Sequence, residues 1–212
     1  MTERATYATL VGMVAYAAIA TDLYLPAIPA MIDAFGATEA QGQLTLSIFM
    51  LGMAAGQLIF GPLSDYYGRI PVITAGTALF VATSVGCALA TNMEVMWLAR
   101  LAQGLAAASG PVIARAIVRD RYHGDRAAQV MSMLGAAMAV IPLIAPTVGS
   151  WVLVWFHWRA TFVALALFGV LILVGLRTFR ESAPAIGEGS IRLIPVLQLF
   201  SVCLRNRPFI GF

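Results

Sequence analysis

An aspartate interrupts the first apolar run of the chain. Asp22 lies within this run, and Pro26 and Pro29 follow it closely. A charged aspartate near the middle of a bilayer costs about 2.5 to 3.5 kcal/mol on insertion scales, so it is expected to face a cavity or a partner rather than lipid. A carboxyl group held there can take up and release a proton, which predicts a proton-coupling role for Asp22. The plainer interpretation is a solvated residue at a helix end.

The fourth apolar run offers a partner for this carboxyl group. Arg100, Gln103 and Gly104 fall on one helical face, because residues three and four apart are neighbours on a helix. This face combines a cation, an amide and a small residue that lets another helix approach. At a rise of about 1.5 Å per residue, Arg100 and Asp22 lie at similar depths, which makes a pair between them feasible. A snorkelling arginine is the alternative.

A short charged segment separates the second and third apolar runs. Between Gly61 and Arg69 the chain carries Asp65 and Gly68. Glycine permits positive φ and close helix approach, and aspartate can cap a helix or pair with arginine. We therefore expect a tight turn over 61–71 with charged partners at the end of the fourth run, an ordinary hairpin being the alternative. Those partners are Arg115, Arg119 and Asp120.

The composition decides what kind of protein carries these residues. The 212 residues are 60% hydrophobic and 11% charged, whereas soluble domains average about half apolar and a quarter charged. With a mean hydropathy of +0.86, the chain is an integral membrane protein. The composition argues against a nucleic-acid binder or a cytosolic enzyme, because the few polar groups of the chain cannot cover a water-facing surface. Two cysteines, Cys87 and Cys203, are too few for a disulfide framework.

Six apolar runs are long enough to cross a membrane, since a spanning helix needs roughly 20 apolar residues. The chain has room for six such helices and not for twelve, and we expect an all-α membrane protein. A signal peptide is the alternative for the first run, and the further spans argue against it. The expected spans are 7–31, 41–60, 72–90, 95–118, 127–154 and 161–176.

The arginines predict the orientation and the domain limits. All 13 basic residues are arginine, and with the N-terminus inside, all but Arg100 and Arg159 face the cytoplasm, as basic residues near span ends do. We expect residues 1–176 to form the bundle. Residues 177–207 are expected to form a cytoplasmic linker with an interfacial helix, because their apolar stretch is too short to span. Residues 208–212 look like the start of a truncated seventh helix.

The fifth apolar run contains Pro142, Pro146 and Gly149. Prolines four residues apart remove backbone hydrogen bonds and bend a helix. We therefore expect a bent fifth helix. A bent packing helix without a role in function is the alternative.

These segments together resemble the major facilitator superfamily. The spacing of glycine, aspartate, glycine and arginine in 61–69 is similar to its signature loop, although Tyr66 and Ile70 stand where a basic residue is frequent. The Arg100-x-x-Gln103-Gly104 pattern resembles its fourth-helix motif, and the fifth run resembles the proline- and glycine-rich motif of drug:proton antiporters. With the 22–29 block and 158–162, the chain looks like the Bcr/CflA (bicyclomycin-resistance) branch.

The resemblance implies the N-terminal six-helix bundle of a twelve-helix transporter that exports hydrophobic drug-like compounds in exchange for protons across a bacterial cytoplasmic membrane. Its partners would be membrane lipid, protons, a small hydrophobic substrate, and either a C-terminal half or a second copy; no nucleic acid, cofactor or metal is expected. The implied residues are Asp22 and Arg100 for coupling; Tyr24, Met53, Gln103 and Gly104 for the substrate cavity; Gly61, Asp65, Gly68, Arg69, Arg115, Arg119 and Asp120 for a cytoplasmic gate; and Pro142, Pro146 and Gly149 for bending.

Two other classes of function are alternatives for such a chain. An intramembrane protease is disfavoured, because Ser109-Gly110 lacks the preceding glycine of a rhomboid-like site and Asp22 is the only acid expected inside a span. We expect no enzyme. A half-protein that binds a partner and transports nothing is the more serious alternative, because alternating access rocks two six-helix halves around a central site.

Overall fold

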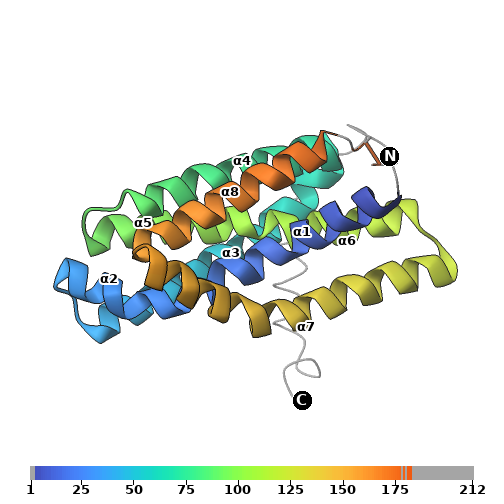
Figure 1. Cartoon of the computed structure of the whole chain (residues 1–212). Helices are drawn as coiled ribbons and strands as arrows, with labels where there is room; N and C mark the ends of the chain where they lie inside the picture. Colours follow the sequence, from blue (N-terminus) through green and yellow to red (C-terminus); the bar gives the residue numbers. More distant parts are fainter. Residues whose placement is uncertain (1–2, 178, 180, 183–212) are drawn as a thin grey trace, which may run out of the picture.

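The computed structural model describes residues 3–177, 179 and 181–182, and these residues form helices and no strand. The helices run roughly parallel and antiparallel in one elongated bundle (Figure 1). In chain order they are α1 (Glu3–Asp22), the 3-10 turn η1 (Leu25–Ala27), α2 (Ile28–Phe35), α3 (Glu39–Tyr67), α4 (Arg69–Ala88), α5 (Met93–Ala107), α6 (Ser109–Arg121), α7 (Gly124–Trp155) and α8 (Trp158–Leu176).

Six segments are long and apolar enough to span a membrane, as the sequence predicts. The first, Ala5–Phe35, is made of α1, η1 and α2, and the fourth, Met93–Arg121, is made of α5 and α6. The other four spans are single helices. The described part of the chain is therefore a multi-pass membrane protein. The interfacial helix predicted within 177–207 and the helix start predicted at 208–212 lie outside the described residues, apart from residues 177, 179, 181 and 182.

Local sequence signals mark the helix ends at one end of the bundle. The side chain of Thr38 accepts a hydrogen bond from the backbone of Gln41, and Gln41 accepts one back at 2.9 Å, which is a capping box at the start of α3. Asn92 caps α5 through the backbone N–H of Val95 at 2.9 Å. Gly36 ends α2 with a φ of 60°, a conformation that glycine adopts without strain.

The predicted turn over 61–71 is wrong in its extent. α3 continues through Pro62 to Tyr67, and Gly68 alone separates it from α4. Gly68 has a φ of 96°, so a single residue reverses the chain because it carries no Cβ. Pro62 is tolerated inside the helix, where it removes one backbone hydrogen bond without ending the helix here.

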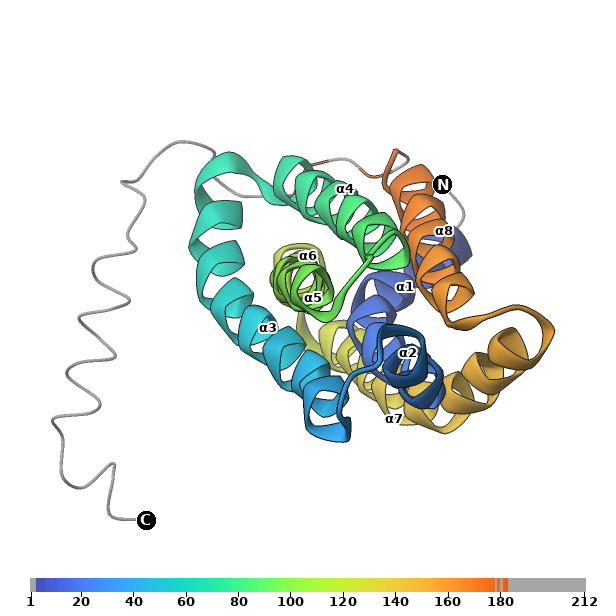
Figure 2. The ribbon, with the colours of Figure 1, turned by 90° about the vertical axis from the view of Figure 1, so that its left-hand side faces the viewer.

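The fourth span occupies the centre of the bundle. Viewed along the bundle, α5 and α6 are surrounded by the other helices (Figure 2). Within the most apolar stretch of this span, 72% of the residues are buried inside the bundle. In the corresponding stretch of α7, only 11% are buried. Glycines bring α3 and α5 into close contact, because a Cβ on Gly104 would meet the carbonyl oxygen of Phe49 and one on Gly52 would meet that of Leu101.

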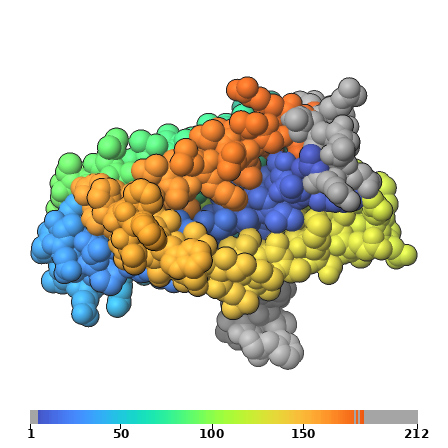
Figure 3. All heavy atoms as spheres, viewed as in Figure 1, coloured from blue at the N-terminus to red at the C-terminus, as the bar shows by residue number. Residues whose placement is uncertain are grey.

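α7 lies at the surface and exposes large apolar side chains along its second half. In Figure 3 it runs along one edge of the molecule. Pro142 and Pro146 are both inside the helix, and Figure 1 shows the helix curving. That these prolines cause the curve stays a prediction. The exposed apolar residues of α7 are Met138, Val140, Leu143, Ile144, Val148, Trp151, Val154 and Trp155.

Candidate functional site

The first span is broken where the sequence places its acid. α1 ends at Asp22, and η1 and α2 complete the span after it. Pro26 lies in the first turn of η1 and Pro29 in the first turn of α2, positions at which a missing N–H costs little. Asp22 is half-buried. It therefore lies at a helix end and also inside a span, which combines the two interpretations of the sequence.

Arg100 on α5 is fully buried next to this break. Its Nη1 donates to the carbonyl oxygen of Ala20 at 3.2 Å and to Oε1 of Gln103 at 2.8 Å. The last carbonyls of a helix have no intrahelical donor, so Arg100 caps the end of α1 from a neighbouring helix.

Aromatic rings surround the guanidinium group. Its carbon atom Cζ lies 4.5 Å from the ring centre of Tyr24, 4.3 Å from that of Phe49 and 5.9 Å from that of Phe162. A desolvated cation gains up to about 2 kcal/mol from such a ring. The rings belong to the break after α1 and to helices α3 and α8, so Arg100 joins these elements inside the bundle.

The pair between Asp22 and Arg100 that the sequence makes feasible is not formed in this structure. Among the residues described, the ion pairs are those that join Arg69 to Asp65 and to Asp120. Nε and Nη2 of Arg100 are buried and form no hydrogen bond. Buried donors without partners are costly and rare in native proteins, so these two nitrogens are available to a further acceptor.

A polar network continues from Gln103. Its Nε2 donates to Oγ of Ser84 at 2.8 Å, and the Sγ of Cys87 donates to its Oε1 at 3.7 Å. On the other side of Arg100, the hydroxyl of Tyr24 shares a 2.7 Å hydrogen bond with Oγ1 of Thr45. All five side chains are buried, so this polar cluster lies inside the six-helix bundle rather than on its surface.

The four predicted cavity residues are divided between two places. Tyr24 and Gln103 contact Arg100, whereas Gly104 lies in the close contact of α5 with α3. Met53 is half-buried on α3 and packs against the apolar core. A substrate-lining role for these residues stays a prediction.

Sequence reasoning missed Thr45, Phe49, Ser84 and Phe162. Thr45 and Phe49 are four residues apart on α3, so a polar and aromatic stripe was available as a signal. Nothing in the sequence indicates that this stripe faces Arg100, because the adjacency of helices is a tertiary property.

An apolar hollow of about 180 Å³ lies beside the break, between α1 and α7. Its walls carry aliphatic side chains and no polar one. None of the predicted cavity residues lines it. The lining residues are Ile19, Leu23, Ile141, Ile144, Ala145 and Val148.

Two of the predicted gate residues, Asp65 and Asp120, bind Arg69 near the junction of α3 and α4. Nε of Arg69 donates to Oδ2 of Asp120 at 2.9 Å, and Nη1 donates to Oδ1 of Asp65 and to Oγ of Ser64. The side chain of Arg69 is 8% exposed, and that of Asp120 is 13% exposed. The structure therefore brings together α3, α4 and α6 through one arginine.

The remaining gate residues lie outside this cluster. Arg115 and Arg119 are exposed on α6, and Arg115 donates to the carbonyl oxygen of Pro111 in its own helix at 2.8 Å. Neither forms an ion pair within the described part of the chain. Gly61 lies inside α3 with no atom near its missing Cβ. Their expected place in the charge cluster is not found.

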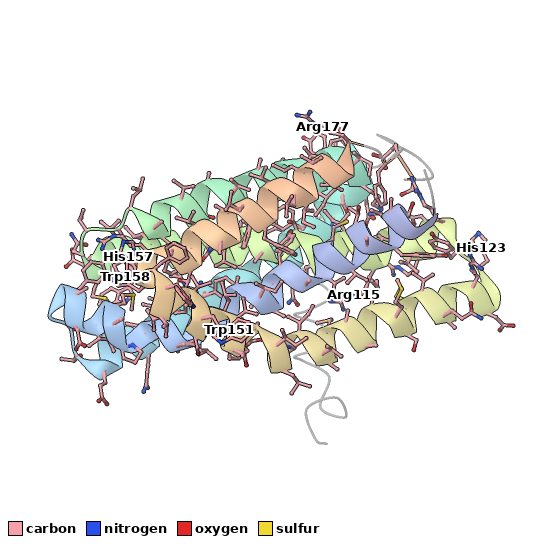
Figure 4. The ribbon with its side chains drawn as sticks, viewed as in Figure 1. Arg115, His123, Trp151, His157, Trp158 and Arg177 are labelled. Carbon is pink, nitrogen blue, oxygen red and sulfur yellow. The ribbon has the colours of Figure 1, made fainter. Side chains whose placement is uncertain are left out.

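The histidines bear on the protease alternative. His123 precedes α7 and His157 precedes α8, at opposite ends of the bundle (Figure 4). Ser109 is buried inside the bundle, and its Oγ bonds to the hydroxyl of Tyr16 and the carbonyl of Ala106. Neither histidine lies at this serine, so the structure forms no serine–histidine pair there.

Comparison with known proteins identifies the family. Residues 10–212 match the family described as "Major Facilitator Superfamily". The chain belongs to the major facilitator superfamily. Solved transporters share its fold: the human organic anion transporter MFSD10 has a TM-score of 0.71 at 20% identity, covering 96% of this chain and 55% of that one. A D-xylose-proton symporter has a TM-score of 0.71 at 16% identity, covering 97% and 54%.

Curated members of the superfamily are similar in sequence. A chloramphenicol resistance protein of Pseudomonas aeruginosa is 41% identical over 152 residues, which cover 71% of this chain and 36% of that protein. The multidrug resistance protein MdtL of Escherichia coli O157:H7 is 36% identical over 173 residues, which cover 80% and 44%. The chain therefore spans less than half the length of these relatives. Both relatives are named for drug resistance, as the resemblance to a drug:proton antiporter branch leads one to expect.

Proposed function

We propose that this chain is the N-terminal half of a proton-coupled exporter of hydrophobic drug-like molecules in a bacterial cytoplasmic membrane, with its N-terminus in the cytoplasm. The observation that carries the proposal is the buried Arg100. Its guanidinium caps the end of α1 at the carbonyl of Ala20, two residues before Asp22, where the first span is broken. The names of the two drug-resistance relatives support the substrate class, and the arginine placement supports the orientation.

Asp22 and Arg100 couple through the end of α1. A negative charge is unfavourable at the C-terminus of a helix, where the helix dipole is itself negative. When Asp22 is protonated, Arg100 stays on the carbonyl of Ala20, as in this structure. When Asp22 is ionised, Nε and Nη2 of Arg100 are the donors left to receive it. Each change of protonation therefore shifts the guanidinium and the break that it caps.

The apolar hollow between α1 and α7 forms one wall of the substrate site. Leu23, which lines it, follows Asp22 directly, so a substrate there lies next to the coupling residue. An aliphatic wall binds by shape and apolar contact, which suits hydrophobic molecules of differing structure. The opposite wall comes from a second six-helix bundle, the C-terminal half or a second copy, which packs against the exposed face of α7.

The cluster around Arg69 is the cytoplasmic gate. A buried arginine shared by two carboxylates from different helices fixes those helices relative to one another. Arg115 and Arg119 are exposed and form no ion pair within the described part of the chain, so they serve orientation in the membrane rather than latching.

Drug accumulation in cells tests the proposal. The complete open reading frame that encodes this chain is expressed in a bacterium without major drug pumps, and uptake of labelled chloramphenicol is followed with and without an uncoupler. We expect lower accumulation that the uncoupler restores. Asp22→Asn should abolish this effect, whereas Asp33→Asn, which changes an exposed aspartate of the same span, should retain it. A membrane-inserted wild-type protein that leaves accumulation unchanged would refute drug export.

A further inference from the structure

The segment that leaves α8 returns a carboxylate to the start of α4. Oε1 of Glu181 accepts a hydrogen bond from the backbone N–H of Arg69 at 2.9 Å, and Oε2 accepts one from that of Ile70 at 3.0 Å. The first amides of a helix have no partner inside it, and here one side chain satisfies two of them. Gly68, the N-cap residue of α4, has no side chain that could do so.

The junction before α4 is shaped to admit this carboxylate. A Cβ on Gly68 would lie 2.7 Å from Oε2 of Glu181 and 3.0 Å from its Cδ. Two features therefore require glycine at position 68. Its φ of 96° is strained for residues with a Cβ, and a Cβ would block the approach of Glu181. The backbone N–H of Ser182 also donates to Oε1 of Glu181 at 2.8 Å, so this oxygen accepts two backbone hydrogen bonds.

Arg69 is held from two sides. Its backbone is bound by Glu181, and its guanidinium is bound by Asp65 of α3 and Asp120 of α6. The N-terminus of α4 carries the positive end of a 20-residue helix, which attracts a carboxylate. Three acids from three parts of the chain thus meet at one residue, and only one of them acts on the backbone.

We propose that Glu181 is a positioning residue of the gate: it straps the segment after α8 onto the first turn of α4 and so sets where Arg69 meets Asp65 and Asp120. The inference rests on the proposed gate and names a residue that acts through Arg69 without contacting substrate. Loss of the carboxylate frees the first turn of α4 to move about Gly68, and the two ion pairs of the guanidinium loosen with it. The segment that leaves the bundle is thereby linked to the gate.

Hydrogen exchange tests the strap independently of transport. In the complete protein, purified and reconstituted, Glu181→Gln should speed amide exchange in a peptide over residues 68–72 by about two- to fivefold, the effect of removing one carboxylate from a helix N-terminus. Glu94→Gln is the matched control, because Glu94 is likewise an acid in the first turn of a helix but is exposed on α5. Equal exchange in wild type and Glu181→Gln overturns the strap.

Transport in a double-mutant cycle tests the positioning role. If Glu181 acts through Arg69, Glu181→Gln slows export in the wild type and adds no further loss in Arg69→Ala, whereas an independent structural role makes the two losses add. Additive losses therefore overturn the proposal. Glu181→Asp, which keeps the charge one methylene shorter, should fall between wild type and Glu181→Gln in both measurements, and it replaces Glu181→Gln if that variant does not fold.

The two experiments separate this inference from the proposed function. If the wild-type protein exports no drug, drug export is refuted, while the exchange of residues 68–72 still decides whether the strap exists. If the wild type exports drug and Glu181→Gln leaves both exchange and export unchanged, the strap alone is refuted.

Discussion

Arg100 donates a hydrogen bond to the backbone carbonyl of Ala20, 3.2 Å away and 80 residues earlier in the chain. This bond joins the most buried span to the end of α1, two residues before Asp22. The guanidinium is held by a carbonyl, an amide and three rings rather than by a carboxylate. The guanidinium of Arg100 is therefore available to the carboxylate of Asp22 when that group is ionised.

Replacing this arginine by lysine tests whether its shape is needed. Arg100→Lys keeps the charge but loses the planar group that stacks between Tyr24 and Phe49 and donates in two directions. We expect export to fall about tenfold or more, the effect of about 1.4 kcal/mol, with the protein still folded. Arg119→Lys, at an exposed position, should retain export. Export at the wild-type rate by Arg100→Lys contradicts the coupling role.

The glycine contact between α3 and α5 predicts a difference in stability. Gly104→Ala places a methyl group against the carbonyl of Phe49, and we expect a loss of about 1–3 kcal/mol. Gly135→Ala is the matched control inside α7, where no atom lies within 4 Å of the added Cβ. It should be neutral or slightly stabilising, because alanine favours helix. Thermal unfolding in detergent measures the stability of both variants. An equal effect of the two substitutions would contradict a close contact between α3 and α5 at Gly104.

The apolar hollow predicts a local effect on substrate affinity. Ile144→Phe enlarges a side chain that lines the hollow, whereas Leu143→Phe changes its neighbour, which is 77% exposed and does not line it. We expect Ile144→Phe to raise the KM for chloramphenicol about fivefold or more, the effect of at least the lower end of the roughly 1–3 kcal/mol that overpacking costs. Leu143→Phe should leave the KM near the wild-type value. Transport kinetics at several drug concentrations decide between them, and equal KM values place the substrate elsewhere.

The proposed gate at Arg69 predicts that its largely buried acid, Asp120, is more important for export than a nearby exposed acid. Asp120→Asn removes one charge from the pair with Arg69, and breaking a largely buried pair costs about 3–5 kcal/mol at most. Asp125→Asn alters an exposed aspartate at the start of α7. We expect slower export and faster proteolysis near residue 68 for the first variant alone. Identical behaviour of the two variants argues against a gate at Arg69.

Much of the fold follows from the length of the apolar runs. Six stretches long enough to span a bilayer predict six spans, and the fixed period of a helix places Arg100, Gln103 and Gly104 on one face. The meeting of Asp65 with Arg69 is also local, since they are four residues apart. These features depend on neighbours in sequence, so the sequence is sufficient to predict them.

The surroundings of Arg100 depend on how helices pack and could not be predicted. Phe49 and Phe162 come from helices that the sequence does not pair with α5, and the carbonyl of Ala20 carries no sequence signal at all. The continuation of α3 through Pro62 was missed for a related reason. A proline costs a helix one hydrogen bond, and whether the surrounding contacts offset that loss is decided by the tertiary structure.

Transport by reconstituted protein tests the central claim most directly. The complete protein and its Asp22→Asn variant are placed in liposomes, and labelled chloramphenicol is followed in two modes, exchange without a gradient and accumulation driven by an imposed pH gradient. We predict that the wild type shows both modes and that Asp22→Asn exchanges drug but does not accumulate it with the gradient, because the variant cannot carry a proton. Accumulation by Asp22→Asn equal to that of the wild type would contradict the account.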